Sequence, residues 1–220
     1  MTLWVKICGV TTVDDARAAA RAGVDALGLN FVRASKRFID PRRAREIIDA
    51  VGRSVTWVGV VADEPASRLR ELRDEVGFDL WQLHGHEPPE ALEPLLPDAY
   101  KALAMGSSED ARAASRYGGD RVLVDAKVPG ELGGTGQVFD WRLVSELVAE
   151  RRVVLAGGLT PSNVRQAVLS ARPWGVDTAS GVESAPGKKD HESMARFVEE
   201  ARRAYAELSS PRAGADVRSP

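Results

Sequence analysis

Continuous apolar segments alternate with amphipathic segments along most of this chain. The apolar segments lack the polar alternation of half-exposed strands, so they predict strands that are buried on both faces of a parallel sheet. Each one is followed by a segment with apolar residues at helical spacing. The predicted strands are residues 3–8, 25–31, 55–62, 79–83, 99–105, 121–125, 153–156 and 174–178.

Capping signals place the starts of the intervening helices. Asp40 is followed directly by Pro41, and proline suits the first helical position because its fixed φ matches and its missing N–H would have no partner there. Thr160 before a proline predicts the start of the seventh helix in the same way. The residues predicted to cap or open the eight helices are Thr12, Asp40, Glu64, Pro88, Ser107 or Ser108, Asp140, Thr160 and Asp190.

Eight strand–helix alternations within 220 residues predict a single-domain α/β fold, the (β/α)8 or TIM barrel, over residues 1–208. An open doubly wound sheet is the alternative. It would usually carry a G-x-G-x-x-G dinucleotide fingerprint after the first strand, and residues 8–11 lack one, so a nicotinamide cofactor is disfavoured. Residues 209–220 contain Pro, Gly, Ser and Arg without periodicity and predict a disordered tail.

Charge and composition exclude several classes of partner. The 30 Lys and Arg residues nearly balance the 32 Asp and Glu residues, so no basic field attracts nucleic acid or an anionic membrane. The longest apolar stretches, residues 57–62 and 153–159, are far too short to span a bilayer. The N-terminus has no signal-peptide pattern and Cys8 is the single cysteine, so we expect a cytoplasmic protein without an internal disulfide.

Barrel enzymes carry their catalytic groups at the carboxyl ends of the strands and in the loops that follow. Cys8 ends the first predicted strand and Asp125 ends the sixth, so their side chains can face each other across a bound substrate. Alone, the cysteine could be a small core residue and the aspartate a helix cap. To act as base and acid near neutral pH, the pair needs a site that lowers the pKa of the thiol and raises the pKa of the carboxyl.

Two glycine-rich strand ends predict a phosphate site. Gly157 and Gly158 follow the seventh strand, and Ser180 and Gly181 follow the eighth. Backbone N–H groups in such loops converge on an anion without a side chain in the way, and barrels commonly bind phosphate at this corner. The alternative, that these glycines only form tight turns, is weaker for the pair of loops than for either loop alone. A small phosphorylated substrate is therefore the expected partner.

A series of short motifs resembles one enzyme family over residues 5–190. The motifs are Val5–Gly9, Val58–Val60, Gln82–Gly85, Leu123–Asp125, Gly133–Gly136, Phe139–Trp141, Leu155–Leu159, Gly175–Asp177, Ser180–Glu183 and Pro186–Asp190. Each motif alone is weak, but so many in this order are specific. The chain is similar to phosphoribosylanthranilate isomerase of tryptophan biosynthesis.

The resemblance implies an isomerase that carries out an Amadori rearrangement and requires no cofactor and no metal. N-(5-phosphoribosyl)anthranilate would become 1-(2-carboxyphenylamino)-1-deoxyribulose 5-phosphate, the third step of tryptophan synthesis from chorismate. The residue matching Asp125 protonates the furanose ring oxygen, and the residue matching Cys8 takes the proton from C2. Arg37 would hold the anthranilate carboxylate with its planar guanidinium. The other residues implied in substrate binding are Gln82, His84, Gly133 and Gly134.

Several points stay open within this resemblance. His84 is either a substrate contact or a polar turn residue. The loop 126–139, longer than an ordinary connection, is either a floppy segment or a lid over the substrate. Lys36 stands where the family usually has Pro, beside Arg37, and Ala179 stands where it has Ser, which puts loop rigidity and one phosphate-site hydroxyl in doubt. We expect a monomer or a homodimer.

Other interpretations of the site compete with this one. The sister isomerase of histidine biosynthesis, or a bispecific barrel, shares the chemistry but uses a carboxylate where Cys8 stands and has a second phosphate site. A Schiff-base aldolase would need Lys101 or Lys127 as its amine. A catalytically silent barrel would bind phosphorylated metabolites without turnover. A metal site from Cys8, His84 and His86 lacks the short-spaced ligand pair that a regular element supplies.

Overall fold

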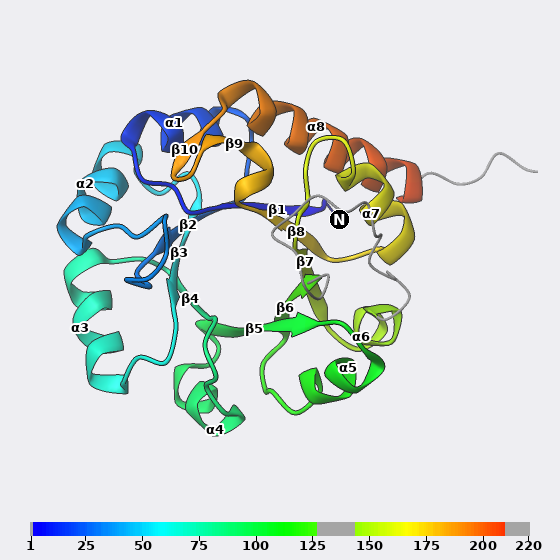
Figure 1. The fold of residues 1–220 in the computed structure, drawn as a ribbon, viewed down its shortest axis with the longest axis horizontal. Coiled ribbons are helices and arrows are strands. Elements are labelled where there is room, and N and C mark those ends of the chain that lie inside the picture. Colours follow the sequence, from blue (N-terminus) through cyan, green and yellow to red (C-terminus); the bar gives the residue numbers. More distant parts are fainter. Residues whose placement is uncertain (1, 127–143, 210–220) are drawn as a thin grey trace, which may run out of the picture.

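The computed structural model describes residues 2–126 and 144–209. Its eight parallel strands pair in sequence order and close into a barrel, and the helices form an outer ring (Figure 1). The strands are β1 (Trp4–Cys8), β2 (Ala26–Asn30), β3 (Thr56–Val61), β4 (Leu80–Leu83), β5 (Ala99–Met105), β6 (Arg121–Ala126), β7 (Arg152–Ala156) and β8 (Gly175–Thr178). The predicted (β/α)8 barrel is confirmed, and each strand overlaps its predicted range.

The helices begin close to their predicted caps in most cases. The helices are α1 (Val13–Arg21), α2 (Pro41–Val51), α3 (Ala66–Val76), α4 (Pro89–Leu92), the 3-10 helix η1 (Glu93–Leu95), α5 (Ser108–Ala114), α6 (Ser145–Glu150), α7 (Val164–Ala171) and α8 (His191–Ser209). The Thr12 side chain accepts the N–H of Asp15 at 3.1 Å, and Asp40 accepts the N–H of Arg42 at 3.0 Å. Among the described residues, no helix is both long and apolar enough to cross a bilayer.

The start of α7 differs from the prediction. Thr160 does not cap the helix, which begins at Val164. Asn163 accepts the N–H of Thr160 at 2.7 Å and donates to the carbonyl of Gly158 at 3.0 Å, so its side chain closes a separate turn before the helix. The fourth and fifth helices are also shorter than predicted, because α4 gives way to η1 and α5 ends at Ala114.

Two predicted features, a helix cap and the C-terminal tail, lie wholly or mostly outside the described residues. Asp140, predicted to open the sixth helix, and most of the predicted disordered tail belong to the ranges 127–143 and 210–220. The one described residue of that tail, Ser209, is the last residue of α8. The single-domain boundary over residues 1–208 stays a prediction.

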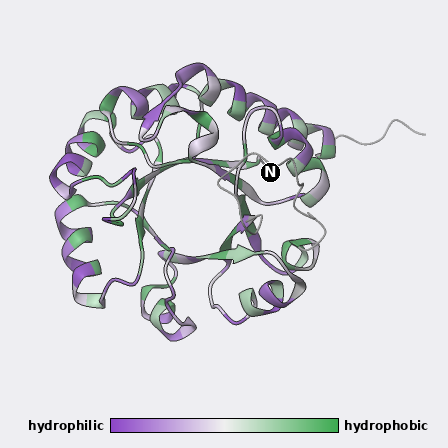
Figure 2. Ribbon diagram, in the orientation of Figure 1, coloured by the Kyte–Doolittle hydropathy of each residue, from purple (hydrophilic) through white to green (hydrophobic). Residues whose placement is uncertain are grey.

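Apolar residues pack against both faces of the barrel strands, inside the barrel and beneath the helices. One cluster lines the inside and consists of Ala26, Val58, Tyr100, Ala102, Leu123, Val154 and Ala156. A larger cluster packs between the strands and the surrounding helices. Figure 2 shows the helices with apolar residues toward the strands and polar residues outward. Burial on both faces explains why the strands are continuously apolar in the sequence.

Aromatic rings surround one arginine at the N-terminal end of the barrel. Trp4 and Trp174 stack with their ring centroids 5.2 Å apart. The Arg121 guanidinium lies 4.9 Å from the Trp174 ring centre and 5.7 Å from that of Tyr100. Such cation–π contacts are favourable when the cation is shielded from water. Barrel enzymes carry their sites at the opposite end, where the strands have their carboxyl ends.

Short elements after β8 were not predicted. The 3-10 helix η3 (Ser180–Val182) leads into an antiparallel pair, β9 (Glu183–Ala185) and β10 (Lys188–Lys189). This hairpin lies near α1 in Figure 1, and the Thr11 hydroxyl donates to the carbonyl of Gly187 at 2.6 Å. The hairpin thereby brings charged side chains to the carboxyl ends of the first two strands.

Candidate active site

The two residues predicted as acid and base lie at the same end of the barrel. Cys8 is the last residue of β1, and Asp125 is the last but one of β6. All strands of a parallel barrel have their carboxyl ends at one mouth, which is where barrel enzymes place their chemistry. The structure therefore brings both residues to one rim, although 117 positions separate them in the sequence.

The Cys8 side chain points into the barrel and is only 8% exposed. Side chains two positions apart in a strand share a face, and Lys6 is buried inside the barrel against Asp177. A Cβ placed on Gly28, beside Cys8 in β2, would lie 2.8 Å from the Cys8 sulfur and 3.2 Å from Cε of Lys6. Glycine at position 28 thus leaves room for the thiol and the lysine side by side.

A buried ion pair accompanies the thiol. Nζ of Lys6 donates to Oδ2 of Asp177 at 2.7 Å, from paired positions of β1 and β8. Burial lowers the pKa of Lys6, but the charge and hydrogen bond of Asp177 together with the nearby Cys8 and Tyr100 outweigh burial, and the pKa is raised. Lys6 is therefore a permanent positive charge. Sequence reasoning gave this pair no role, although a lysine inside an apolar strand is a signal for a buried partner.

The electrostatics of the thiol correct one prediction. Burial raises the pKa of Cys8, and the positive charges of Lys6 and Lys189 offset only part of that rise, while Asp177 adds to it. The predicted lowering of the thiol pKa is therefore wrong for this structure. A buried thiol favours its neutral form because the thiolate loses the solvation of water. The base needs help from its surroundings to ionise.

A chain of hydrogen bonds leads across the barrel to His84, which lies beside Asp125. The Tyr100 hydroxyl donates to Oε1 of Gln82 at 3.0 Å, which turns the Gln82 amide nitrogen toward Nδ1 of His84 at 3.3 Å. The Gln82 amide nitrogen can only donate, so Nδ1 of His84 accepts this hydrogen bond. A neutral His84 therefore carries its proton on Nε2. Nε2 lies 3.8 Å from Oδ2 of Asp125, and burial lowers the pKa of His84 despite the opposing charge of Asp125. His84 thus faces the predicted acid as a neutral donor.

Arg37 is held by a carboxylate of the protein itself. Its Nε and Nη2 donate to the two oxygens of Glu183 at 2.7 and 2.6 Å. Glu183 also accepts from Nζ of Lys189 at 2.9 Å. Burial raises the pKa of Glu183, but its hydrogen bonds to these two cations lower it overall. Nη1 of Arg37 has no hydrogen-bond partner in the described part of the chain, so one edge of the guanidinium stays available. Sequence reasoning missed Glu183 as a partner, because no local pattern links residues 146 positions apart.

The loops after β7 and β8 approach each other closely. Gly157 and Gly158 have φ values of +92° and +62°, a region that favours glycine. A Cβ on Gly181 would overlap the carbonyl oxygen of Leu159, so the turn after β8 can rest on the β7 loop only with glycine there. Ser180 is exposed beside this contact. The four predicted phosphate-site residues therefore belong to two loops in contact, and Gly133 and Gly134 lie outside the described residues.

Lys101 is not placed as a nucleophilic amine. Its Nζ donates to the carbonyl oxygens of Leu83, Gly85 and Ala102 at 3.2, 2.7 and 3.1 Å and to the Glu87 carboxylate at 3.0 Å. The side chain is 2% exposed, so no substrate carbonyl can reach the nitrogen. These bonds tie the loop that carries His84 to β5 and argue against the aldolase interpretation. Lys127 lies outside the described residues.

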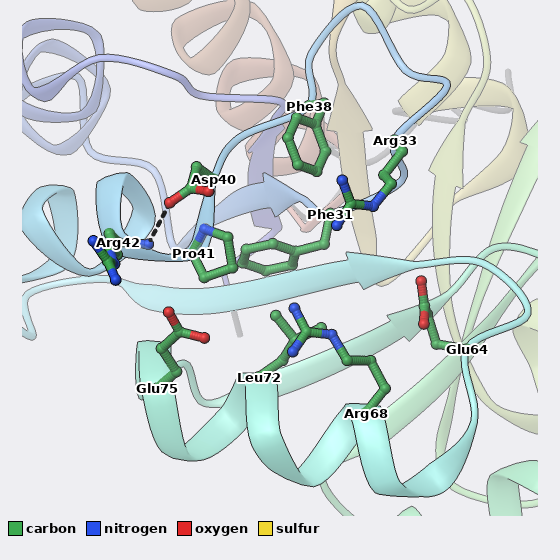
Figure 3. A pocket seen from close by; sticks show the side chains of 10 residues that line it. All are labelled: Phe31, Arg33, Phe38, Asp40, Pro41, Arg42, Glu64, Arg68, Leu72 and Glu75. Carbon is green, nitrogen blue, oxygen red and sulfur yellow. Dashed lines mark hydrogen bonds between the residues drawn. The ribbon is translucent and has the colours of Figure 1, made fainter.

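Within the part of the chain that the structure describes, neither a group of metal ligands nor the outer pocket between the loop after β2 and helix α3 adds a competing site. In the described ranges, no group of three or more His, Cys, Asp and Glu side chains could hold a metal ion. A pocket on the outside of the barrel, between the loop after β2 and helix α3, is shown in Figure 3. Phe31 and Phe38 line it together with charged residues such as Arg68 and Glu75. None of the predicted catalytic residues belongs to this pocket.

The fold and the mouth define a class of protein, a (β/α)8-barrel enzyme with a thiol, a carboxyl and a glycine-lined corner at one end. A family model described as "N-(5'phosphoribosyl)anthranilate (PRA) isomerase" matches residues 5–200. The chain belongs to this family. The resemblance carried by the sequence motifs is confirmed.

Relatives and solved structures are similar to this chain over nearly its whole length. N-(5'-phosphoribosyl)anthranilate isomerase of Geobacter sp. (strain M21) is 43% identical over 199 residues, which are 90% of this chain and 98% of the relative. The crystal structure of the phosphoribosyl anthranilate isomerase from Thermotoga maritima has a TM-score of 0.84 at 37% identity, covering 91% of this chain and 99% of that one. A structure of the same kind of enzyme in complex with reduced 1-(O-carboxyphenylamino)-1-deoxyribulose 5-phosphate has a TM-score of 0.81 at 35% identity, with the same coverage.

Proposed function

We propose that this chain converts N-(5-phosphoribosyl)anthranilate into 1-(2-carboxyphenylamino)-1-deoxyribulose 5-phosphate, an Amadori rearrangement, by general acid–base catalysis. One observation carries the proposal. Cys8 and Asp125, on strands far apart in the sequence, lie at the same mouth of the barrel, where its strands have their carboxyl ends. Membership of the isomerase family supports the same reaction.

Asp125 serves the acid step. Its side chain is 23% exposed, so it can reach a substrate at the mouth. In this step the protonated carboxyl gives its proton to the furanose ring oxygen, the C1–O bond breaks, and the lone pair of the anilino nitrogen forms a C1=N iminium. Neutral His84 can hydrogen-bond the carboxyl without pairing with it as an ion. General acid catalysis of this kind contributes roughly 10² to 10⁴ in rate.

Cys8 serves the base step. The thiolate takes the proton from C2, the electrons of that C–H bond form the C1=C2 double bond, and the iminium electrons return to nitrogen. The resulting enolamine gains a proton at C1 and loses the proton of its C2 hydroxyl, which gives the ketone. The sulfur lies inside the mouth and is sheltered from solvent, so the enolamine intermediate would be protected from bulk water.

Two anchors would hold the substrate by its ends. The free Nη1 edge of Arg37 suits the anthranilate carboxylate, because a guanidinium binds carboxylates in its own plane. The corner formed by Gly157, Gly158, Ser180 and Gly181 suits the phosphate, because backbone N–H groups bind anions and glycine leaves them accessible. Fixed ends would align C1 and C2 with the acid and the base.

The other described residues implied in substrate binding are His84 and Gln82, and they have different roles. The His84 side chain is 41% exposed and can touch the substrate. Gln82 is 1% exposed, and Tyr100 and His84 already engage its amide oxygen and nitrogen. Gln82 therefore orients His84 rather than binding the substrate.

The assay follows the loss of fluorescence of freshly prepared phosphoribosylanthranilate. The parent should turn it over, and Cys8→Ser and Asp125→Asn should each lose at least about 10²-fold in kcat, because each removes one proton transfer. Asp63→Asn is the matched control, since Asp63 also follows a barrel strand but hydrogen-bonds His86, whose side chain is 99% exposed. The control should keep its kcat.

Three outcomes count against the proposal. A silent parent that still binds the reduced product in calorimetry would identify a binding barrel without turnover. A parent that neither binds nor converts this substrate would remove the proposed reaction. An Asp125→Asn variant that keeps most of the parental rate would remove the acid from its assigned role.

The working context is also proposed. The protein would act in the cytoplasm, as a monomer or homodimer, on a small phosphorylated metabolite rather than on nucleic acid or a membrane. Analytical ultracentrifugation at micromolar concentration distinguishes the two oligomeric states, and larger assemblies would contradict both.

A further inference from the structure

The buried pair of Lys6 and Asp177 has no part in the acid–base mechanism above. Both side chains are almost fully buried inside the barrel, beneath the mouth. Burying two charges costs solvation free energy, and a well-packed apolar pair is often at least as stable. Fold stability alone therefore does not explain a lysine at this position. Its neighbour on the same face of β1 is the thiol of Cys8.

The geometry places the lysine and the sulfur next to each other. Both crowd the point where a Cβ of Gly28 would stand, as described above. Asp177 fixes Nζ of Lys6 at 2.7 Å from β8, so the ammonium cannot swing away. The charge of Lys6 lowers the pKa of the thiol. The barrel thus holds a cation at a fixed place beside the sulfur.

Other charged and titratable groups act on the thiol from other elements of the barrel. They are Lys189 of β10, Arg37 of the loop after β2, Asp177 of β8 and Tyr100 of β5. Lys189 and Arg37 share the carboxylate of Glu183, which offsets part of their charge. Among the groups that act on the thiol, Lys6 opposes the effect of burial most strongly.

We propose that Lys6, anchored by Asp177, is a positioning residue that presents a fixed positive charge to the Cys8 sulfur and so favours the thiolate form that takes the proton from C2. Lys6 does not touch the reacting atoms in this role. It stabilises the thiolate that the base step needs, against the cost of burial. The inference rests on the proposed function for its catalytic meaning, but its physical content, the ionisation of Cys8, is measurable without substrate.

The test is a pH titration of the thiolate ultraviolet absorbance in the intact protein. Cys8 is the single cysteine of the chain, so the signal has one source, and Cys8→Ser supplies the baseline. Lys6→Met removes the charge and keeps the length of the side chain. It should lower the thiolate fraction at a given pH about tenfold, an upward shift of about one pKa unit. Lys6→Arg should restore most of the parental titration.

A second variant and a matched control make the result interpretable. Lys6→Met with Asp177→Asn avoids an unpaired buried carboxylate, which destabilises the fold of the single variant. Because Lys6 acts on the thiol more strongly than Asp177, this double variant should still titrate higher than the parent. Lys101→Met removes another buried, carboxylate-paired lysine of the same barrel and should leave the thiol titration unchanged.

The kinetic readout should move in parallel. The limb of the kcat/KM profile that rises with pH should shift upward in Lys6→Met by the same amount as the thiol titration, with its plateau recovered at high pH. An unchanged thiol titration in the folded Lys6 variants, or an equal shift in Lys101→Met, would overturn the inference. A shifted thiol titration in a protein that fails to convert phosphoribosylanthranilate would leave the inference standing and defeat the proposed function instead.

Discussion

Replacing Gly28 with alanine would put a methyl group against the proposed base. The added Cβ would lie 2.8 Å from the Cys8 sulfur, 3.1 Å from Cα of Cys8 and 3.2 Å from Cε of Lys6. Ordinary contacts of a Cβ begin at 3.4 Å, so the sulfur has to move by about 0.6 Å, the difference between 3.4 and 2.8 Å. A shift of the Cys8 backbone instead of the sulfur is limited, because β1 is hydrogen-bonded into the closed barrel.

Two separate effects follow from this displacement. Overpacking a buried site typically costs about 1–3 kcal/mol of stability. A misplaced reacting group costs rate in addition, on the order of 10- to 100-fold in kcat for a shift of this size. The stability loss is general, whereas the loss of kcat depends on the role of the thiol.

Gly59→Ala provides the control for overpacking. A Cβ on Gly59, in β3, would lie 2.7 Å from Cζ of Phe78, which packs edge-on against Trp81 between the strands and the helices. This variant should be destabilised to a similar degree while its kcat stays near that of the parent. Urea unfolding and the fluorescence assay measure the two effects. Equal kcat losses in both variants, or full kcat in Gly28→Ala, would refute the placement of the thiol at the reacting carbon.

Three further predictions follow from other contacts of the site. Glu183→Gln should raise KM more than it lowers kcat in steady-state kinetics, because Arg37 loses its bidentate partner. The pKa of Glu183 is lowered in the folded protein, so its stabilising contribution is lost as pH falls through the acidic range. The melting temperature of Glu183→Gln should therefore fall less than that of the parent between about pH 5 and 3. Glu87→Gln should cost about 3 kcal/mol in urea unfolding at neutral pH, because Lys101 keeps a buried charge without its counter-ion; an unchanged midpoint would contradict this. Gly181→Ala should raise KM about tenfold, the equivalent of about one lost hydrogen bond to a charged group, with kcat nearly unchanged, and competition by inorganic phosphate should weaken in parallel.

The order of strands and helices could be predicted because the signals for it are local. Burial on both faces makes the strands largely apolar, and caps such as Asp40 mark helix starts within a few residues. The start of α7 could not be placed this way. Asn163 competes with Thr160 for the same turn, and only the folded loop shows that its side chain reaches back to Gly158.

The placement of Cys8 and Asp125 was predictable because a parallel barrel gathers all strand ends at one mouth. The partners of these residues were not. The contact of Arg37 with Glu183 depends on a hairpin too short to leave a periodic pattern, and the direction of the thiol pKa depends on how deeply Cys8 is buried. Burial depth is a property of the closed barrel, so the residue type alone does not reveal it.

The central claim is that the Cys8 thiol and the Asp125 carboxyl act on the same bound sugar. The most direct measurement is a crystal structure of this chain with the reduced product, 1-(O-carboxyphenylamino)-1-deoxyribulose 5-phosphate. The proposed mechanism predicts the sulfur within contact distance of C2, the carboxyl on the opposite side of the same sugar, and the phosphate on the loops after β7 and β8. A sugar that leaves either side chain out of reach, or a phosphate bound elsewhere, would contradict it.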